Sequence, residues 1–239
     1  MGDLARVVVP VGGGGLASGI AIAIKSQRPE VEVIGVEVET CAPYVASHAA
    51  GEPVDVEPTL ATIADGIAVK KPGELTYPLI QRWLDGMVAV AEDEVAEAMV
   101  WLMERAKLVV EGAGAVGVAA LIGGQVRPAP GGTTAVVLSG GNVDAGLLAQ
   151  VARRHESQAG RRLVFLTKVP DRPGALGRLL TVVGETGANL VDVEHVREGI
   201  DLHVRETGVQ LVLETRGSEH AQAVLEALAA KGYEARVLR

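Results

Sequence analysis

The stretch Val7-Val8-Val9-Pro10-Val11-Gly12-Gly13-Gly14-Gly15-Leu16 decides the fold of this 239-residue chain. Residues 7–11 have no polar alternation, which is typical of a strand buried on both faces of a parallel sheet. The alanine-rich segment 16–25 predicts a helix directly after the glycines. Glycines adopt positive φ and carry no Cβ, so their backbone N–H groups can converge on an anion at a helix N-terminus. The pattern therefore predicts a phosphate-binding turn, without saying which phosphate.

Composition predicts a soluble α/β protein with one or two cores, because 48% of the residues are hydrophobic. The net charge of −8 and the absence of Lys/Arg runs argue against nucleic-acid and membrane-surface partners. The single cysteine, Cys41, cannot form an internal disulfide, so we expect a reducing, cytoplasmic location. Pro10 and the glycines interrupt the apolar run 7–24, so we expect neither a signal peptide nor a membrane span.

The first forty residues predict a βαβ unit. Residues 31–38 form a second apolar run that ends in Glu37 and Glu39. Gly12-x-Gly14-x-x-Ala17, followed by an acidic residue at a strand end, also satisfies the dinucleotide-binding fingerprint. Spacing alone therefore favours NAD.

A second glycine-rich turn follows the last strand predicted in the first domain. The five prolines of 41–78 predict short helices and loops; we then expect a strand at 87–91, helices at 92–107 and 116–122, and a strand at 134–138. Ser139-Gly140-Gly141-Asn142 comes directly after that strand. Because ligands in open α/β sheets lie beyond the carboxyl ends of strands, both glycine turns can face one ligand. Glu111, in the small-residue turn 111–115, is an acid that needs a partner in an apolar setting.

The pattern changes after residue 151. We predict a first domain at 1–151, a polar linker at 152–161 and a second domain at 162–239. The second domain reads as strand 163–169, helix 175–185, strands 189–197 and 209–215, helix 218–231 and strand 233–238, the split βαββαβ order. Its turn 170–174 offers free N–H groups at a helix start, and we expect it to lie beside the start of the second strand at 187–189.

Four motifs together resemble the PLP-dependent threonine ammonia-lyases (threonine dehydratases). They are Pro10-Val11-Gly12-Gly13-Gly14-Gly15-Leu16, Asp65-Gly66-Ile67-Ala68-Val69, Glu111-Gly112-Ala113-Gly114-Ala115 and Ser139-Gly140-Gly141-Asn142. The tail, with Asp171-Arg172-Pro173-Gly174-Ala175-Leu176 and Gly187-Ala188-Asn189-Leu190, resembles an ACT domain, a small-molecule sensor. The resemblance implies part of a fold-type II PLP-enzyme domain, with a parallel sheet and helices on both faces, followed by a ferredoxin-like ACT domain. It moves the prediction from NAD to PLP.

The resemblance also implies residue roles. Gly12, Gly13, Gly14 and Gly15, with Leu16, would hold the PLP phosphate. Ser139 would face the pyridine nitrogen, where a neutral hydroxyl suits β-elimination, and Glu111 would lie near the cofactor. The implied reaction is loss of water from threonine or serine, followed by hydrolysis to a 2-oxo acid and ammonia.

For the ACT domain, the resemblance implies an aliphatic amino-acid effector, isoleucine or valine. We expect the site to form where two such domains pair, so the chain is predicted to be a homo-oligomer. Backbone N–H groups would bind the carboxylate, and apolar neighbours the side chain. The predicted effector residues are Asp171, Pro173, Gly174, Ala175, Leu176, Asn189 and Leu190.

The chain departs from the family pattern upstream of the glycines. The family's Schiff-base lysine lies in an Asn/Ser-Phe-Lys-x-Arg-Gly type segment there, and none of the six lysines here has that context. We therefore expect the C-terminal portion of such an enzyme, a fragment or mis-started gene product that is inactive alone. Thr40, Cys41 and Ala42 replace the acidic cluster that binds a divalent cation in serine racemases, so no metal is expected. A non-enzymatic amino-acid-binding regulator and an NAD-binding protein are the alternatives.

Overall fold

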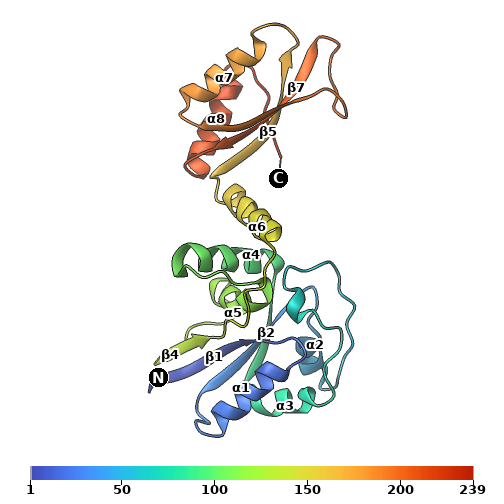
Figure 1. The fold of residues 1–239 in the computed structure, drawn as a ribbon, viewed down its shortest axis with the longest axis vertical. Coiled ribbons are helices and arrows are strands. Elements are labelled where there is room, and N and C mark those ends of the chain that lie inside the picture. The colour runs from blue at the N-terminus through green and yellow to red at the C-terminus, as the bar shows by residue number, and fades with distance from the viewer. Residues whose placement is uncertain (1, 239) are drawn as a thin grey trace. The chain divides into compact units, whose positions relative to one another are not determined.

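The computed structural model describes residues 2–238, and the chain forms two compact units, residues 1–151 and 152–239 (Figure 1). Unit 1 contains a four-stranded sheet in the order β3-β2-β1-β4, in which every pair of neighbours is parallel. The strands are β1 (Leu4–Pro10), β2 (Glu32–Val38), β3 (Gly86–Val90) and β4 (Thr133–Val136). The predicted parallel sheet is confirmed, with β1 at an inner position.

Helices cover both faces of this sheet. Successive residues of β1 alternate between the faces: Val8 packs with α4 and α5, and Val9 packs with α1. Figure 1 shows α4 and α5 on one side of the strands and α1 and α3 on the other. The helices are α1 (Gly15–Lys25), α2 (Pro43–Ala50), α3 (Thr76–Trp83), α4 (Glu92–Trp101), α5 (Gly112–Ile122) and α6 (Ala145–Gln158), with short turns η1 (Asp65–Ile67) and η2 (Leu102–Ala106).

The small-residue turn before α5 is shorter than predicted. We expected the helix to begin at residue 116, but α5 begins at Gly112, directly after Glu111. Its glycines let the helix approach other backbone closely: a Cβ on Gly112 would lie 2.1 Å from the carbonyl oxygen of Ile63. The motif is therefore a close-packed first helical turn, which brings loop 63–67 against α5.

The predicted linker at 152–161 is largely helical. Helix α6 extends to Gln158, and β5 begins at Arg162. Ala, Arg, Glu and Gln are good helix formers, so a polar segment forms a helix without a wide apolar stripe. Arg161 pairs with Glu156 at 2.8 Å near the helix end.

Unit 2 has the predicted βαββαβ order. Its antiparallel sheet has the strand order β6-β7-β5-β8, and Phe165, Leu179, Leu211 and Leu228 lie fully buried in the core between sheet and helices. The elements are β5 (Arg162–Pro170), α7 (Ala175–Glu185), β6 (Asn189–Val196), β7 (Glu206–Glu214), α8 (Ser218–Ala230) and β8 (Arg236–Val237).

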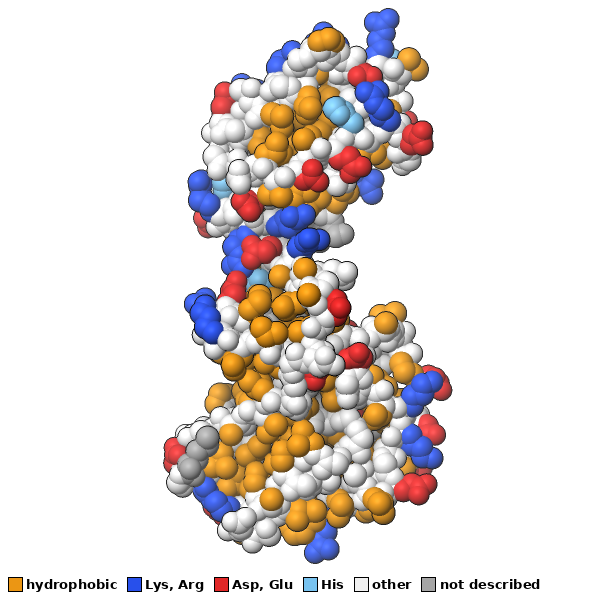
Figure 2. Space-filling view, viewed as in Figure 1, with side chains coloured by type: hydrophobic (Ala, Val, Ile, Leu, Met, Phe, Trp, Pro, Cys, Tyr) orange, Lys and Arg blue, Asp and Glu red, His pale blue; other side chains and the backbone are white. Residues whose placement is uncertain are grey.

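The surface carries charges of both signs. On the face shown in Figure 2, acidic and basic side chains are interspersed with hydrophobic areas. Within residues 2–238, no helix combines the length and the apolar character that crossing a bilayer requires.

Candidate cofactor site

The tetraglycine turn connects β1 to the N-terminus of α1. Gly14 is the N-cap residue and has φ of 83°, in the left-handed region that glycine adopts without strain. No side chain caps the helix, and its first turn contains no acidic residue. The first N–H groups of α1, which carry partial positive charge, are therefore available to an anionic ligand.

A cavity of about 270 Å³ opens above this turn. It is bounded by the turn itself, by η1, by the start of α5 and by Ser139, which lies three residues after the end of β4. Its lining residues are Pro10, Gly12, Gly13, Gly14, Gly15, Leu16, Ala17, Gly66, Ile67, Glu111, Ala113 and Ser139. All seven residues predicted to bind the cofactor line this one cavity, while their role in binding stays a prediction. Sequence reasoning did not assign the other five to the site: Pro10, Ala17, Gly66, Ile67 and Ala113.

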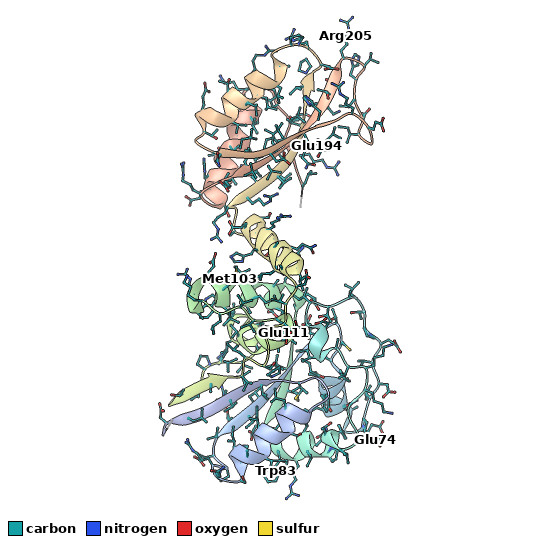
Figure 3. All side chains as sticks on the ribbon, viewed as in Figure 1. Glu74, Trp83, Met103, Glu111, Glu194 and Arg205 are labelled. Carbon is teal, nitrogen blue, oxygen red and sulfur yellow. The ribbon has the colours of Figure 1, made fainter. Side chains whose placement is uncertain are left out.

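Glu111 brings the only acidic side chain of this lining. It is the N-cap residue of α5, and Figure 3 labels it near the start of that helix. Its carboxylate lies against Gly140, where an added Cβ would be 1.9 Å from Oε1, and its N–H donates to the carbonyl of Gly140 at 3.2 Å. Among the described residues, no side chain or backbone N–H donates to the carboxylate. Glu111 is therefore an acceptor available to a ligand, and it lines the cavity that we predicted for the cofactor.

Glu37 is not available to a dinucleotide ribose, whereas Glu39, the second acid predicted at this strand end, is exposed. The NAD interpretation needs an acid at the end of the second strand that can reach a ribose. Glu37 is instead fully buried, and its two carboxylate oxygens accept N–H bonds from Tyr44 (3.1 Å) and Val45 (2.7 Å) at the start of α2. Burial raises the pKa of Glu37 to about 7, against the opposing effect of these two hydrogen bonds. The acid serves the packing of α2.

The two predicted effector segments of unit 2 lie at opposite ends of the sheet within one chain. Asn189, the first residue of β6, and Arg162, the first residue of β5, both lie opposite Glu214 of β7. Asp171 follows the last residue of β5 and therefore lies at the other end of the sheet. Our expectation that they lie side by side was wrong. β5 and β6 both run antiparallel to β7 and therefore parallel to each other, so α7 returns the chain to the end of the sheet where β5 starts before β6 begins.

Each predicted effector segment has partners of its own. Asp171 forms an ion pair with Arg197 at 2.9 Å, and the Asn189 amide donates to Glu214 at 2.9 Å. Gly174, with φ of 77°, is the N-cap residue of α7 and has no side-chain cap. The predicted free N–H groups of the turn are largely engaged, because the N–H groups of Asp171, Arg172 and Ala175 donate to backbone carbonyls. Pro173 precedes it, Ala175 is buried, and Leu176 and Leu190 are partly exposed.

Comparison with known proteins identifies the family. The model of the pyridoxal-phosphate dependent enzymes matches residues 1–140, and the ACT domain model matches residues 163–232. The chain belongs to the pyridoxal-phosphate dependent enzymes. It is 46% identical to the L-threonine ammonia-lyase of Thermotoga maritima over 238 residues, which are 99% of this chain and 58% of that protein. The catabolic L-threonine dehydratase TdcB of Escherichia coli is 43% identical over 150 residues, 62% of this chain and 45% of that protein.

Solved structures of the same family resemble unit 1. The processed threonine deaminase isoform 2 of Solanum lycopersicum matches with a TM-score of 0.58 and 32% identity, over 64% of this chain and 45% of that one. Serine racemase of Dictyostelium discoideum matches with a TM-score of 0.55 and 34% identity, over 60% of this chain and 46% of that one. The chain spans 58% of the length of its Thermotoga relative.

The residues in the cavity fit the phosphate end of pyridoxal phosphate. An uncapped helix N-terminus and a left-handed glycine suit a dianion, and the Ser139 hydroxyl and Glu111 carboxylate lie across the same cavity. The described lining includes no lysine.

Proposed function

We propose that this chain forms the phosphate-binding part of a threonine ammonia-lyase and its regulatory domain. The observation that carries the proposal is that the tetraglycine turn, Glu111 and Ser139 line one cavity in a chain with ACT architecture in its second unit. The 46% identity to L-threonine ammonia-lyase supports threonine as substrate. We further propose a cytoplasmic homo-oligomer.

Each group that lines the cavity has its own proposed role. The N–H groups at the start of α1 bind the phosphate, and the buried side chain of Ile67 closes the apolar wall beside Gly12. The Ser139 hydroxyl would hold the pyridine nitrogen of the bound cofactor by a hydrogen bond, without giving it a full positive charge. Glu111 accepts an N–H or O–H of the bound ligand. When bound, pyridoxal phosphate supplies the electron sink that stabilises negative charge at the substrate Cα, which permits loss of the β-hydroxyl.

The sheet register supports an effector site shared by two copies of the chain. Because the Gly174 turn and Asn189 are at opposite ends of one sheet, both can contact one amino acid only when they come from two chains. We propose that isoleucine or valine binds between two copies, so that binding and association are coupled.

A fusion protein tests the proposed function by adding the part of a relative that this chain does not cover. Residues 1–239 are fused to the portion of the Thermotoga maritima relative that this chain does not cover, and 2-oxobutanoate formation from threonine is followed with added pyridoxal phosphate. We expect activity from the fusion protein and none from residues 1–239 alone. The matched control is the fusion carrying Ser139→Ala, which should lose most of its activity while still binding the cofactor.

The outcomes separate the alternatives. A fusion protein that deaminates serine but not threonine would correct the substrate. A folded fusion that binds pyridoxal phosphate but deaminates neither would contradict the lyase. If the chain then still bound an aliphatic amino acid, a non-enzymatic regulator would be the better account.

A further inference from the structure

Two hydroxyl side chains lie behind the tetraglycine turn, on helices that are distant in the sequence. Tyr44 is on α2, and Thr76 is the first residue of α3. The Tyr44 and Thr76 hydroxyl oxygens lie 2.9 Å and 2.7 Å from the Gly13 carbonyl oxygen. Each hydroxyl carries one proton and the two oxygens also contact each other, so one hydroxyl donates to the carbonyl while the other donates to its neighbour. Neither residue lines the cavity. Both contact the turn at one backbone atom, the Gly13 carbonyl oxygen.

The two hydroxyls form a connected group. Their oxygens are 2.6 Å apart, and the Tyr44 oxygen also accepts the N–H of Gly73 at 3.0 Å. Tyr44 is 1% exposed and packs in the same core as Ile80 of α3. A buried, tightly packed phenol has little freedom to move, so the group holds the Gly13 carbonyl in one direction.

Holding the Gly13 carbonyl in one direction also fixes the direction of the Gly14 N–H. The described residues contain no cis peptide bond, so the C=O of Gly13 and the N–H of Gly14 point in opposite directions across one planar trans peptide group. The bond to Tyr44 and Thr76 therefore directs the Gly14 N–H away from α2 and α3. Gly14 itself lines the cavity.

We propose that Tyr44 and Thr76 clamp the Gly13 carbonyl and so position the turn for the phosphate of the cofactor. They are positioning residues, because they act through the backbone. This inference rests on the proposed cofactor site. The physical reason is that four consecutive glycines are too flexible to hold their N–H groups in place for a phosphate without an external constraint.

The test compares variants that remove one hydroxyl each while keeping the packing. They are Tyr44→Phe, Thr76→Val and the double variant, with Thr76→Ser to restore a hydroxyl. The matched control is Tyr77→Phe, because the Tyr77 hydroxyl bonds Gln81 along α3 and not the turn. The full chain is used throughout, and circular dichroism confirms that each variant folds.

Two measurements are made. The first is amide hydrogen exchange over residues 13–16 without ligand. The second is the affinity for pyridoxamine 5′-phosphate, which has no aldehyde to react with lysines, compared with pyridoxamine, which has no phosphate. We expect each single substitution to speed exchange and to weaken binding of the phosphorylated ligand by about threefold to tenfold. The double variant should lose more than either, Thr76→Ser and Tyr77→Phe should match the wild type, and pyridoxamine binding should not change.

The outcomes separate a failure of the proposed clamp from a failure of the proposed cofactor site. A double variant with wild-type exchange over 13–16 and wild-type affinity for the phosphorylated ligand would overturn the clamp. A wild-type chain that binds both ligands equally, or neither, would overturn the cofactor site. In that case the exchange measurement still decides whether Tyr44 and Thr76 order the turn.

Discussion

Gly14 combines two constraints that a side chain would violate. A Cβ there would lie 2.5 Å from the Tyr44 hydroxyl and 2.9 Å from Ile80, and its φ of 83° is unfavourable for other residues. We expect Gly14→Ala to reduce the free energy of unfolding by about 1–3 kcal/mol and to weaken phosphate binding. Urea unfolding measures the first effect. Gly15→Ala is the control, because nothing lies within 4 Å of an added Cβ, and equal losses in both variants would contradict the argument.

Glu37 makes stability depend on pH. Burial raises its pKa from 4.5 to about 7 in the folded chain. Between these values the folded state holds a proton that the unfolded state releases, so the stabilisation from neutral Glu37 is full below 4.5 and is lost as pH rises through 7. Its contribution should fall by on the order of 3 kcal/mol across this window.

Glu37→Gln isolates that contribution, because glutamine resembles the protonated acid and does not titrate. Urea unfolding of wild type and variant at several pH values gives the two slopes. The variant should lose less stability than the wild type between about pH 5 and pH 8. Parallel curves would show that Glu37 does not titrate in this range.

At the scale of elements, helical glycines divide into those that permit close packing and those that do not. A Cβ added to Gly112 in α5 would lie 2.1 Å from the Ile63 carbonyl oxygen, whereas a Cβ added to Gly19 in α1 would have nothing within 4 Å. Alanine is the better helix former, so Gly19→Ala should stabilise the chain by up to about 1 kcal/mol. Gly112→Ala should destabilise it by on the order of 2 kcal/mol despite the same propensity gain. Thermal unfolding of both variants tests this, and a stabilising Gly112→Ala would refute the close contact.

The elements themselves were largely predictable from the sequence, because their signals are local. The apolar run 7–11 and the alternation after residue 161 specify buried and half-buried strands directly. The cavity residues Glu111 and Ser139 were also predictable, since each begins a glycine-containing motif that has a counterpart in the family. Tyr44 and Thr76 were not, because they contact the turn through one backbone oxygen, 31 and 63 residues away. The separation of the effector segments depends on strand order, which no local pattern contains.

At the scale of the whole molecule, effector binding should depend on chain concentration. Calorimetry of the full chain should find binding of isoleucine or valine at millimolar concentration or tighter, and binding should promote association. Asn189→Ala and Gly174→Val should weaken binding. Gly217→Val is the control, because Gly217 is the N-cap residue of α8 and also has positive φ. Absence of heat with isoleucine, valine, threonine and serine would leave unit 2 without a sensing role.

The central claim is that the turn after β1 binds the phosphate of pyridoxal phosphate. The most direct measurement is a fluorescence titration of the full chain with pyridoxamine 5′-phosphate and, separately, with NADH. The account predicts saturable binding of pyridoxamine 5′-phosphate that inorganic phosphate competes away, and no saturable binding of NADH, because the chain belongs to the pyridoxal-phosphate dependent enzymes. Saturable NADH binding, or pyridoxamine 5′-phosphate binding that phosphate does not compete with, would contradict it.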